Sequence, residues 1–290
     1  MNPALPETRW GRFALIWGSK TYLMGVLNVT PDSFSRDGLL GAATSEEAIV
    51  RAAVERASAM VADGADVIDV GGESTRPGAA PVALEEELRR VLPVVQTLVG
   101  ALPQVPISID TSKAEVARRA LEAGAGLVND VTGLHGDPAM AEVIAHYAVP
   151  VVVMSHRRGL ERYEVMSDTL RVLASSLECG LQAGIRWEMM ILDPGFGFGL
   201  KPQENLELLR RLGELRVLGR PVLIGTSRKG TLGRVLGGLP VEERLEATAA
   251  TVALSIAQGV DMVRVHDVRA MARVARVADA VVRGWKDVGA

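Results

Sequence analysis

The sequence predicts an α/β fold, a (β/α)8 TIM barrel with a short N-terminal extension, and two observations support this. Eight apolar stretches are each followed by a segment with helical spacing, which is the repeat of such a barrel. The stretches are almost continuously apolar, as parallel strands covered on both faces are. They are Leu23–Val29, Val67–Gly72, Val105–Thr111, Leu127–Val131, Val151–Ser155, Met189–Pro194, Val222–Ser227 and Met262–Asp267. One barrel of roughly 250 residues plus an extension would make residues 1–290 a single domain.

The extension and the first helix have their own signals. Residues 1–20 precede the repeat, and Phe13–Trp17 could pair as a short β-hairpin that closes the bottom of the barrel. After the first strand, Thr44 and Glu47 have the spacing of a capping box at a helix start. Gly64 is suited to the position just beyond the end of that helix.

The second and third helices carry two further signals. Pro93 lies inside the second helical pattern, so a kink or a break is expected there. Ser112 and Glu115 have capping-box spacing at the start of the third helix.

Composition and charge argue against several classes of protein. The net charge of -3 and the pI near 5.9 are unlike those of most nucleic-acid-binding domains. No apolar run is long enough to span a membrane, and the first residues lack the apolar core of a signal peptide. The single cysteine, Cys179, permits no intrachain disulfide, and no histidine pair has zinc-ligand spacing. A cytoplasmic protein is expected.

Most of the apolar stretches end in a polar side chain, and barrel active sites lie at these strand ends. Asp110 could accept hydrogen bonds from an amino-substituted heterocycle, act as a base, bind a metal, or only cap a helix or pair with a neighbouring strand. Asn129 and Asp193 could join it in binding a planar guanidine-like edge. Asp130 could take the place of Asn129, and either of these two could simply cap the following helix.

Cationic residues follow the last two stretches. Lys229 could form a Schiff base, neutralise an anion or donate to a ring carbonyl. Arg264 and His266 alternate along the eighth stretch and so point to one face. With Ser227 they form a predicted cationic cluster where barrels often bind phosphate, whereas Arg228 could simply be solvated.

Two loops on the same side of the predicted barrel, Asn28–Gly38 and Gly71–Pro81, are long, polar and rich in Gly, Pro, Ser and Thr. Long loops at such positions are often lids. Arg76 in the second loop could close on the same anion.

Seven segments resemble, in order, the motifs of the dihydropteroate synthase family. They span Met24 to Asp267 and read MGVLNVTPDSFS, GGESTRPGA, ISIDTSK, NDVTG, LDPGFGFG, GTSRKG and RVHD. The resemblance implies a transferase of folate biosynthesis that uses Mg2+ and is inhibited by sulfonamides. It would condense 7,8-dihydropterin-6-ylmethyl diphosphate with 4-aminobenzoate to 7,8-dihydropteroate and diphosphate. The implied route is SN1-like diphosphate departure followed by arylamine attack.

The resemblance also implies roles for individual residues. Those matching the family's pterin-binding positions are Asp110, Asn129, Asp193 and Lys229, and Met154 is expected to pack on the pterin ring. Those matching the diphosphate positions are Asn28, which is also the implied magnesium ligand, Arg264 and His266. Those matching the aminobenzoate region are Thr75, Arg76, Pro77, Phe198 and Ser227. The residues expected to be catalytic are Asn28, Asp110, Lys229 and Arg264.

The family further implies a homodimer, for which the last two helices, with Ala249, Ala250 and Ala253, are the expected interface. Three alternatives remain at this point. One is a diverged paralogue that binds a pterin without condensing it. Another is a pterin-binding methyltransferase domain acting with a corrinoid partner. The third is a metal-dependent, aldolase-like lyase, which predicts Schiff-base trapping at Lys229 or several carboxylate ligands.

Overall fold

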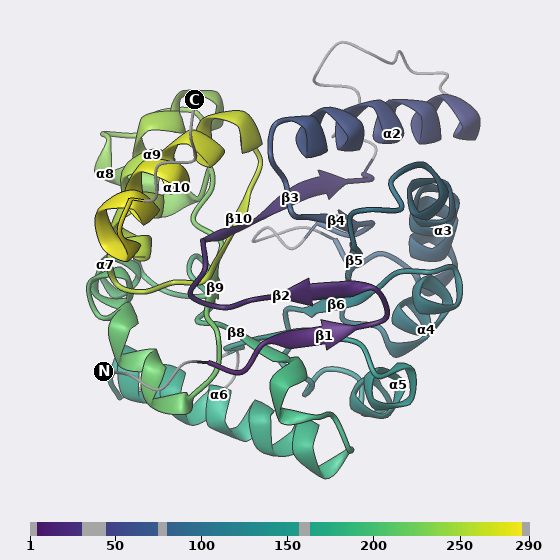
Figure 1. Ribbon diagram of the computed structural model, residues 1–290, viewed down its shortest axis with the longest axis horizontal. Coiled ribbons are helices and arrows are strands. Elements are labelled where there is room, and N and C mark those ends of the chain that lie inside the picture. Colours follow the sequence, from purple (N-terminus) through teal and green to yellow (C-terminus); the bar gives the residue numbers. More distant parts are fainter. Residues whose placement is uncertain (1–4, 31–44, 75–79, 157–162, 286–290) are drawn as a thin grey trace.

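The computed structural model describes residues 5–30, 45–74, 80–156 and 163–285 (Figure 1). In these ranges eight parallel strands form one sheet in the order β8-β7-β6-β5-β4-β3-β10-β9. A bridge between Leu192 and Val222 joins the two outer strands. The sheet therefore closes on itself, and the predicted (β/α)8 barrel is confirmed.

The strands agree with the eight apolar stretches, and most are shorter by a residue or more at one end. Their side chains are almost all buried, because the interior and the surrounding helices cover both faces. They are β3 (Tyr22–Asn28), β4 (Val67–Gly71), β5 (Ile107–Asp110), β6 (Leu127–Asp130), β7 (Val151–Met154), β8 (Met190–Asp193), β9 (Leu223–Ile224) and β10 (Met262–Val265).

Helices surround the barrel and connect its strands (Figure 1). They are α2 (Glu46–Ala62), α3 (Leu84–Ala101), α4 (Ala114–Glu122), α5 (Met140–Tyr147), α6 (Val165–Gln182), α7 (Pro202–Arg210), α8 (Gly230–Val235), α9 (Leu245–Ala257) and α10 (Val268–Arg283). The described ranges also contain the short 3-10 helices η1 (Trp187–Met189), η2 (Leu212–Leu218) and η3 (Val241–Glu243). In the described ranges, none of the helices has both the length and the apolar character needed to cross a membrane.

A hairpin of β1 (Thr8–Trp10) and β2 (Phe13–Leu15) lies across the barrel in Figure 1. Thr8 Oγ1 donates to the carbonyl of Glu188, which precedes β8, at 2.6 Å. Trp17 Nε1 donates to the same hydroxyl at 3.0 Å. These contacts place the hairpin at the N-terminal ends of the strands, as expected, although the predicted segment supplies only its second strand.

Two helix starts differ from their local signals. Helix α2 is capped by Ser45, whose side chain accepts from Ala48 N, while Thr44 lies outside the described residues. Helix α4 begins after Lys113, and its first amide, Ala114 N, donates to Asp137 of a later loop at 2.9 Å. The predicted capping box at Ser112 is therefore wrong, because a residue distant in sequence supplies the cap.

Helix α3 runs through Pro93 without a break, contrary to one of the two expected outcomes. Proline in a helix interior costs roughly 3 kcal/mol. One face of α3 buries Leu88, Val91, Val94 and Leu98, and each such side chain stabilises the fold by roughly 1.5–3 kcal/mol. The packing of this face outweighs the missing hydrogen bond. At the end of α2, Gly64 has the expected left-handed conformation, with φ +106°.

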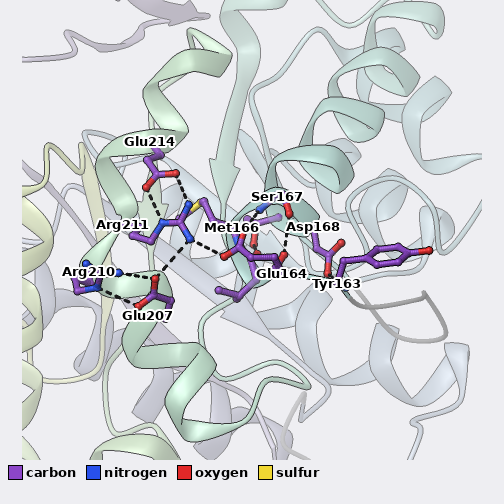
Figure 2. Close-up of polar contacts among 11 residues, drawn as sticks. Tyr163, Glu164, Met166, Ser167, Asp168, Glu207, Arg210, Arg211 and Glu214 are labelled. Atoms are coloured by element: carbon purple, nitrogen blue, oxygen red, sulfur yellow. Dashed lines mark hydrogen bonds and ion pairs between the residues drawn. The ribbon is translucent and has the colours of Figure 1, made fainter.

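Ion pairs connect the start of α6 with α7 and η2 on the outside of the barrel (Figure 2). Glu164 accepts from the backbone of Met166 and Ser167 and so caps α6. Arg211 donates to Glu164 and to Glu214, both at 2.6 Å. These groups are partly exposed, so the ion pairs add little stability.

Candidate active site

Four side chains meet inside the barrel near the C-terminal ends of its strands. Arg264 of β10 donates from Nε to Asp69 Oδ2 and from Nη2 to Asp110 Oδ2, both at 2.6 Å. Asn129 of β6 donates from Nδ2 to the same Asp69 oxygen at 2.9 Å. Three of these residues are predicted site residues, and the structure brings them together. The fourth, Asp69, is missing from the sequence prediction, although a charge inside the apolar run Val67–Gly72 is itself a signal, because it must be compensated there.

Strand alternation decides which residues face the interior. Asp110 and Asn129 are partners in register, and both point into the barrel. Asp130, the neighbour of Asn129, points the other way: its carboxylate accepts from Thr132 N at 2.8 Å and Leu134 N at 2.7 Å. Of the two alternatives that the sequence left open, Asn129 is the interior residue and Asp130 caps the next loop.

The protonation of Asp110 is sensitive to its surroundings. Burial raises its pKa, Arg264 opposes this, and the charges of Asp69 and Glu87 raise it further, to about 7. For Arg264, burial alone would lower the pKa, but the nearby carboxylates, Asp193 included, raise it. The arginine therefore remains charged, while Asp110 can gain or lose its proton near neutral pH.

Lys229 follows β9 and lies over an aromatic ring at the barrel mouth. Its Nζ is 4.1 Å from the centroid of the Phe198 ring, which is a cation–π contact. Gly197, with φ +83°, makes this possible, since a Cβ there would lie 2.9 Å from Lys229 Cδ. The glycine-rich turn thus allows the close approach of the lysine, and two predicted residues come together.

Met154 and Asp193 are partners in register at the ends of β7 and β8. Both are buried, and Asp193 Oδ1 accepts from Gly195 N at 2.8 Å. Gly195 has φ +77°, and a Cβ there would lie 2.7 Å from the Ser155 carbonyl oxygen. One carboxylate oxygen of Asp193 therefore holds the turn that brings Gly195 against the end of β7.

His266 contacts Ser227 across the ends of β9 and β10. The Ser227 hydroxyl accepts from His266 N at 3.2 Å and lies 3.0 Å from His266 Nδ1. Burial, followed by the charges of Arg264, Arg228 and Lys229, lowers the pKa of His266 well below its usual value. A lowered pKa favours the neutral histidine at pH 7, which would bind an anion through a ring N–H and leave the positive charge of the predicted cluster to its other members.

Arg228 has a left-handed backbone with φ +61°, which is unusual for a residue other than glycine. It donates to Asp267 from Nε at 3.0 Å and from Nη2 at 2.6 Å, so it is paired and not merely solvated. Its backbone N donates to Thr248 Oγ1 at 3.2 Å. Because it lies between Ser227 and Lys229, these contacts fix the turn that carries both residues.

Asn28 ends β3 and pairs in register with Gly71. A Cβ at Gly71 would lie 3.8 Å from Asn28 Oδ1 and 3.5 Å from Asp110 Cβ. The glycine therefore keeps side-chain atoms out of the space between these two residues. The amide oxygen of Asn28 is a suitable Mg2+ ligand. No three His, Cys, Asp or Glu side chains of the described ranges group as a metal site.

Three predicted aminobenzoate residues lie outside the described residues: Thr75, Arg76 and Pro77. The residues on either side of them are held together. Glu73 accepts from Val82 N at 3.3 Å and forms an ion pair with Lys113. Lys113 also pairs with the buried Glu87 at 2.5 Å. This links the two ends of the loop to the start of α4 and to α3.

The family model described as pterin binding enzyme matches residues 24–266. The dihydropteroate synthase of Synechocystis is 43% identical over 289 residues, covering 97% of this chain and 96% of its own length. The crystal structure of Clostridium difficile dihydropteroate synthase in the presence of pteroic acid has a TM-score of 0.86 at 46% identity, covering 92% of this chain and 98% of that one. The Xanthomonas albilineans enzyme with 4-aminobenzoic acid has a TM-score of 0.87 at 40% identity, covering 96% and 98%.

Proposed function

The chain belongs to the dihydropteroate synthase family, and we infer from this that it is a transferase of folate biosynthesis. It condenses 7,8-dihydropterin-6-ylmethyl diphosphate with 4-aminobenzoate to give 7,8-dihydropteroate and diphosphate. The main support for this function is that hydrogen bonds to Asp69 and Asp110 bring Arg264 and Asn129 together near the barrel mouth, in a chain that is similar to these synthases over 97% of its length.

We assign the pterin to the interior side chains. Its aminopyrimidine edge presents N–H donors, which need acceptors such as the carboxylates of Asp110 and Asp193. Asn129 commits its N–H2 to Asp69, so it can offer its carbonyl oxygen to the ligand. Lys229 would donate to the ring carbonyl, as a cation whose position is supported by the ring of Phe198.

We assign the diphosphate to the space near Asn28, Arg264 and His266. The neutral His266 would donate one N–H, and Arg264 would supply charge. The donor set at Asn28 fits Mg2+, which usually takes few protein oxygens and several from substrate phosphates. Bound there, Mg2+ would offset the charge that develops on the departing diphosphate.

The chemistry follows from these assignments. The bond from the exocyclic carbon to the diphosphate oxygen breaks, and the electron pair leaves with the diphosphate. The amine of 4-aminobenzoate then attacks the carbon cation and loses a proton. Phe198 and Ser227, with Thr75, Arg76 and Pro77, would hold the aminobenzoate. Lys229 over the Phe198 ring acts as a cation in this scheme, not as the nucleophile of a lyase.

The direct test is incubation with the pterin diphosphate, 4-aminobenzoate and Mg2+, while diphosphate and dihydropteroate are both measured. We expect the two products to appear in equal amounts and to require both substrates. Diphosphate release without dihydropteroate would point to a pterin-binding paralogue. Trapping of a substrate on Lys229 by borohydride would favour a lyase.

We also propose that the chain forms a homodimer through α9 and α10, which lie side by side (Figure 1). Large apolar side chains on these helices are exposed, including Leu254, Val277 and Val281. Contiguous exposed apolar surface often marks an interface. Val277→Glu with Val281→Glu should give a monomer in sedimentation velocity, and an unchanged sedimentation coefficient would contradict this interface.

We place the enzyme in the cytoplasm, where a chain with the single cysteine Cys179 needs no disulfide. Fractionation of the source cells, with a cytoplasmic marker enzyme as reference, tests this.

A further inference from the structure

Asp69 contacts two of the residues assigned to the substrate and is itself enclosed. Its relative exposure is 0%. Its Oδ2 accepts from Arg264 Nε at 2.6 Å and from Asn129 Nδ2 at 2.9 Å. One oxygen atom of β4 therefore holds a guanidinium from β10 and an amide from β6, which come from different parts of the barrel wall.

A carboxylate at this position determines how both partners are oriented. An ionised carboxylate can only accept hydrogen bonds, so Arg264 and Asn129 must turn donor groups toward it. The amide of Asn129 then directs its oxygen elsewhere, and the Nε side of Arg264 is committed to Asp69. Buried ion pairs add little net stability, because desolvation offsets the attraction. Stability alone therefore does not account for a charge at this depth.

The two carboxylates that Arg264 contacts lie at different depths. Asp69 pairs in register with Ser108, whereas Asp110, two residues beyond Ser108, pairs with Gly71 at the mouth. Two residues along a strand amount to about 6–7 Å. A ligand that enters past Gly71 meets Asp110 first, while Asp69 lies below it.

This difference separates the roles of the two carboxylates during binding. If the pterin donates to Asp110, as the proposed function requires, it shares the Asp110 carboxylate with Arg264 Nη2 and can displace it. The contact between Arg264 Nε and Asp69 is not exposed to that competition. Asp69 can therefore keep the guanidinium in place while Asp110 changes partner.

We propose that Asp69 is a positioning residue of the synthase reaction: it holds the Arg264 guanidinium and the Asn129 amide in the orientation that receives the dihydropterin diphosphate. The proposal rests on the proposed function. It assigns Asp69 no contact with the substrate, and it predicts that the effect of Asp69 passes through Arg264 and Asn129.

The central variant is Asp69→Asn, which keeps the shape of the side chain and removes its charge. Ser108→Ala is the matched control, because Ser108 is buried, pairs in register with Asp69, and its hydroxyl has no hydrogen-bond partner among the described residues. We expect Asp69→Asn to raise the Kd of the dihydropterin diphosphate, measured by calorimetry without 4-aminobenzoate, at least tenfold. The KM for 4-aminobenzoate should change less than twofold. Ser108→Ala should leave both values within twofold of wild type.

A double-mutant cycle tests whether the effect passes through Arg264. In the Asp69→Asn background, Arg264→Ala should weaken binding of the dihydropterin diphosphate by no more than about threefold, although it costs tenfold or more alone. Independent effects that multiply would overturn the proposal, as would binding of the dihydropterin diphosphate by Asp69→Asn within twofold of wild type. Inactive wild-type enzyme in the condensation assay would instead reject the proposed function.

If Asp69→Asn fails to fold, Arg264→Lys provides a second test of the proposal. Lysine keeps the charge but lacks the fork that spans Asp69 and Asp110. We expect its affinity for the dihydropterin diphosphate to fall to within threefold of that of Arg264→Ala. Wild-type affinity in Arg264→Lys would show that the anchored fork is not needed and would overturn the proposal.

Discussion

Replacing Arg264 with alanine would leave two buried carboxylates without their shared cation. Asp69 and Asp110 have side-chain exposures of 0% and 7%, so water cannot screen them. Removing one partner of a buried ion pair typically costs roughly 3–5 kcal/mol, because the remaining charge stays buried. We therefore expect the free energy of unfolding of Arg264→Ala to fall by roughly 3–5 kcal/mol at pH 8.5.

This loss should shrink at low pH, because protonation removes the buried charge of Asp110. Burial already raises the pKa of Asp110 to about 7 against the opposing charge of Arg264, so the variant should raise it further. A carboxyl group with a higher pKa in the folded state binds more protons there than in the unfolded state. Its charge thus destabilises the fold progressively as the pH rises from the unfolded pKa to the folded one. At pH 5.5 Asp110 is mostly protonated, and the deficit should be smaller by at least about 1.4 kcal/mol.

Urea unfolding at pH 5.5, 7.0 and 8.5, followed by circular dichroism, measures these differences. Arg89→Ala is the control, because Arg89 forms an ion pair with Glu86 on the exposed face of α3. It should lose less than about 1 kcal/mol at every pH. Adding Asp110→Asn to Arg264→Ala should recover stability at pH 8.5. A loss below 1 kcal/mol, or one independent of pH, would refute the reasoning.

Dihydropterin affinity should rise between pH 6 and pH 8, because Asp110, with a pKa near 7, accepts donors best when ionised; a flat profile by calorimetry would contradict this. Asp267→Asn should lower kcat but reduce the free energy of unfolding by at most about 1 kcal/mol, because its ion pair with Arg228 is partly exposed and mainly orients the turn that bears Ser227. Steady-state kinetics and urea unfolding curves would measure the two effects separately. Sulfonamides should bind far more tightly with diphosphate present, since only Phe198 and Ser227 of the assigned pocket come from the barrel; equal affinities in two titrations would mean that the pocket is preformed.

The barrel was predictable from the sequence because the parallel strands of a barrel have a simple sequence pattern. Both faces of each strand are covered, so the strands read as apolar runs, and the polar residues at their ends mark the mouth. The structure accordingly brings Asp110, Asn129 and Arg264 together. The choice between Asn129 and Asp130 could also have been made from the sequence, by extending the two-residue alternation from Asp110 to the next strand.

Other features depend on contacts between residues that are distant in the sequence, so no local sequence pattern predicts them. The cap of α4 comes from Asp137, which lies well beyond the helix in the sequence, so the local spacing at Ser112 misleads. The neutral state of His266 depends on burial and on cations from other segments, which no spacing rule contains. Asp69 is different, because a lone acid within a buried strand already requires a partner, and that signal was visible in the sequence.

The charges inside the barrel suit a reaction that passes through a cation. Three carboxylates, Asp69, Asp110 and Asp193, act on Arg264, and Lys229 is the other cation near Asp110. Arg228 is neutralised by Asp267, and His266 carries no charge. When Asp110 is ionised, acids outnumber bases among these interior groups, which would stabilise positive charge spreading into a bound pterin.

An enzyme that stabilised an anionic intermediate at the same place would need the opposite balance of charges, so this arrangement favours diphosphate departure before arylamine attack. Asp110→Asn should accordingly slow single-turnover diphosphate release more than it weakens pterin diphosphate binding, and an equal loss in both would argue against a cationic intermediate.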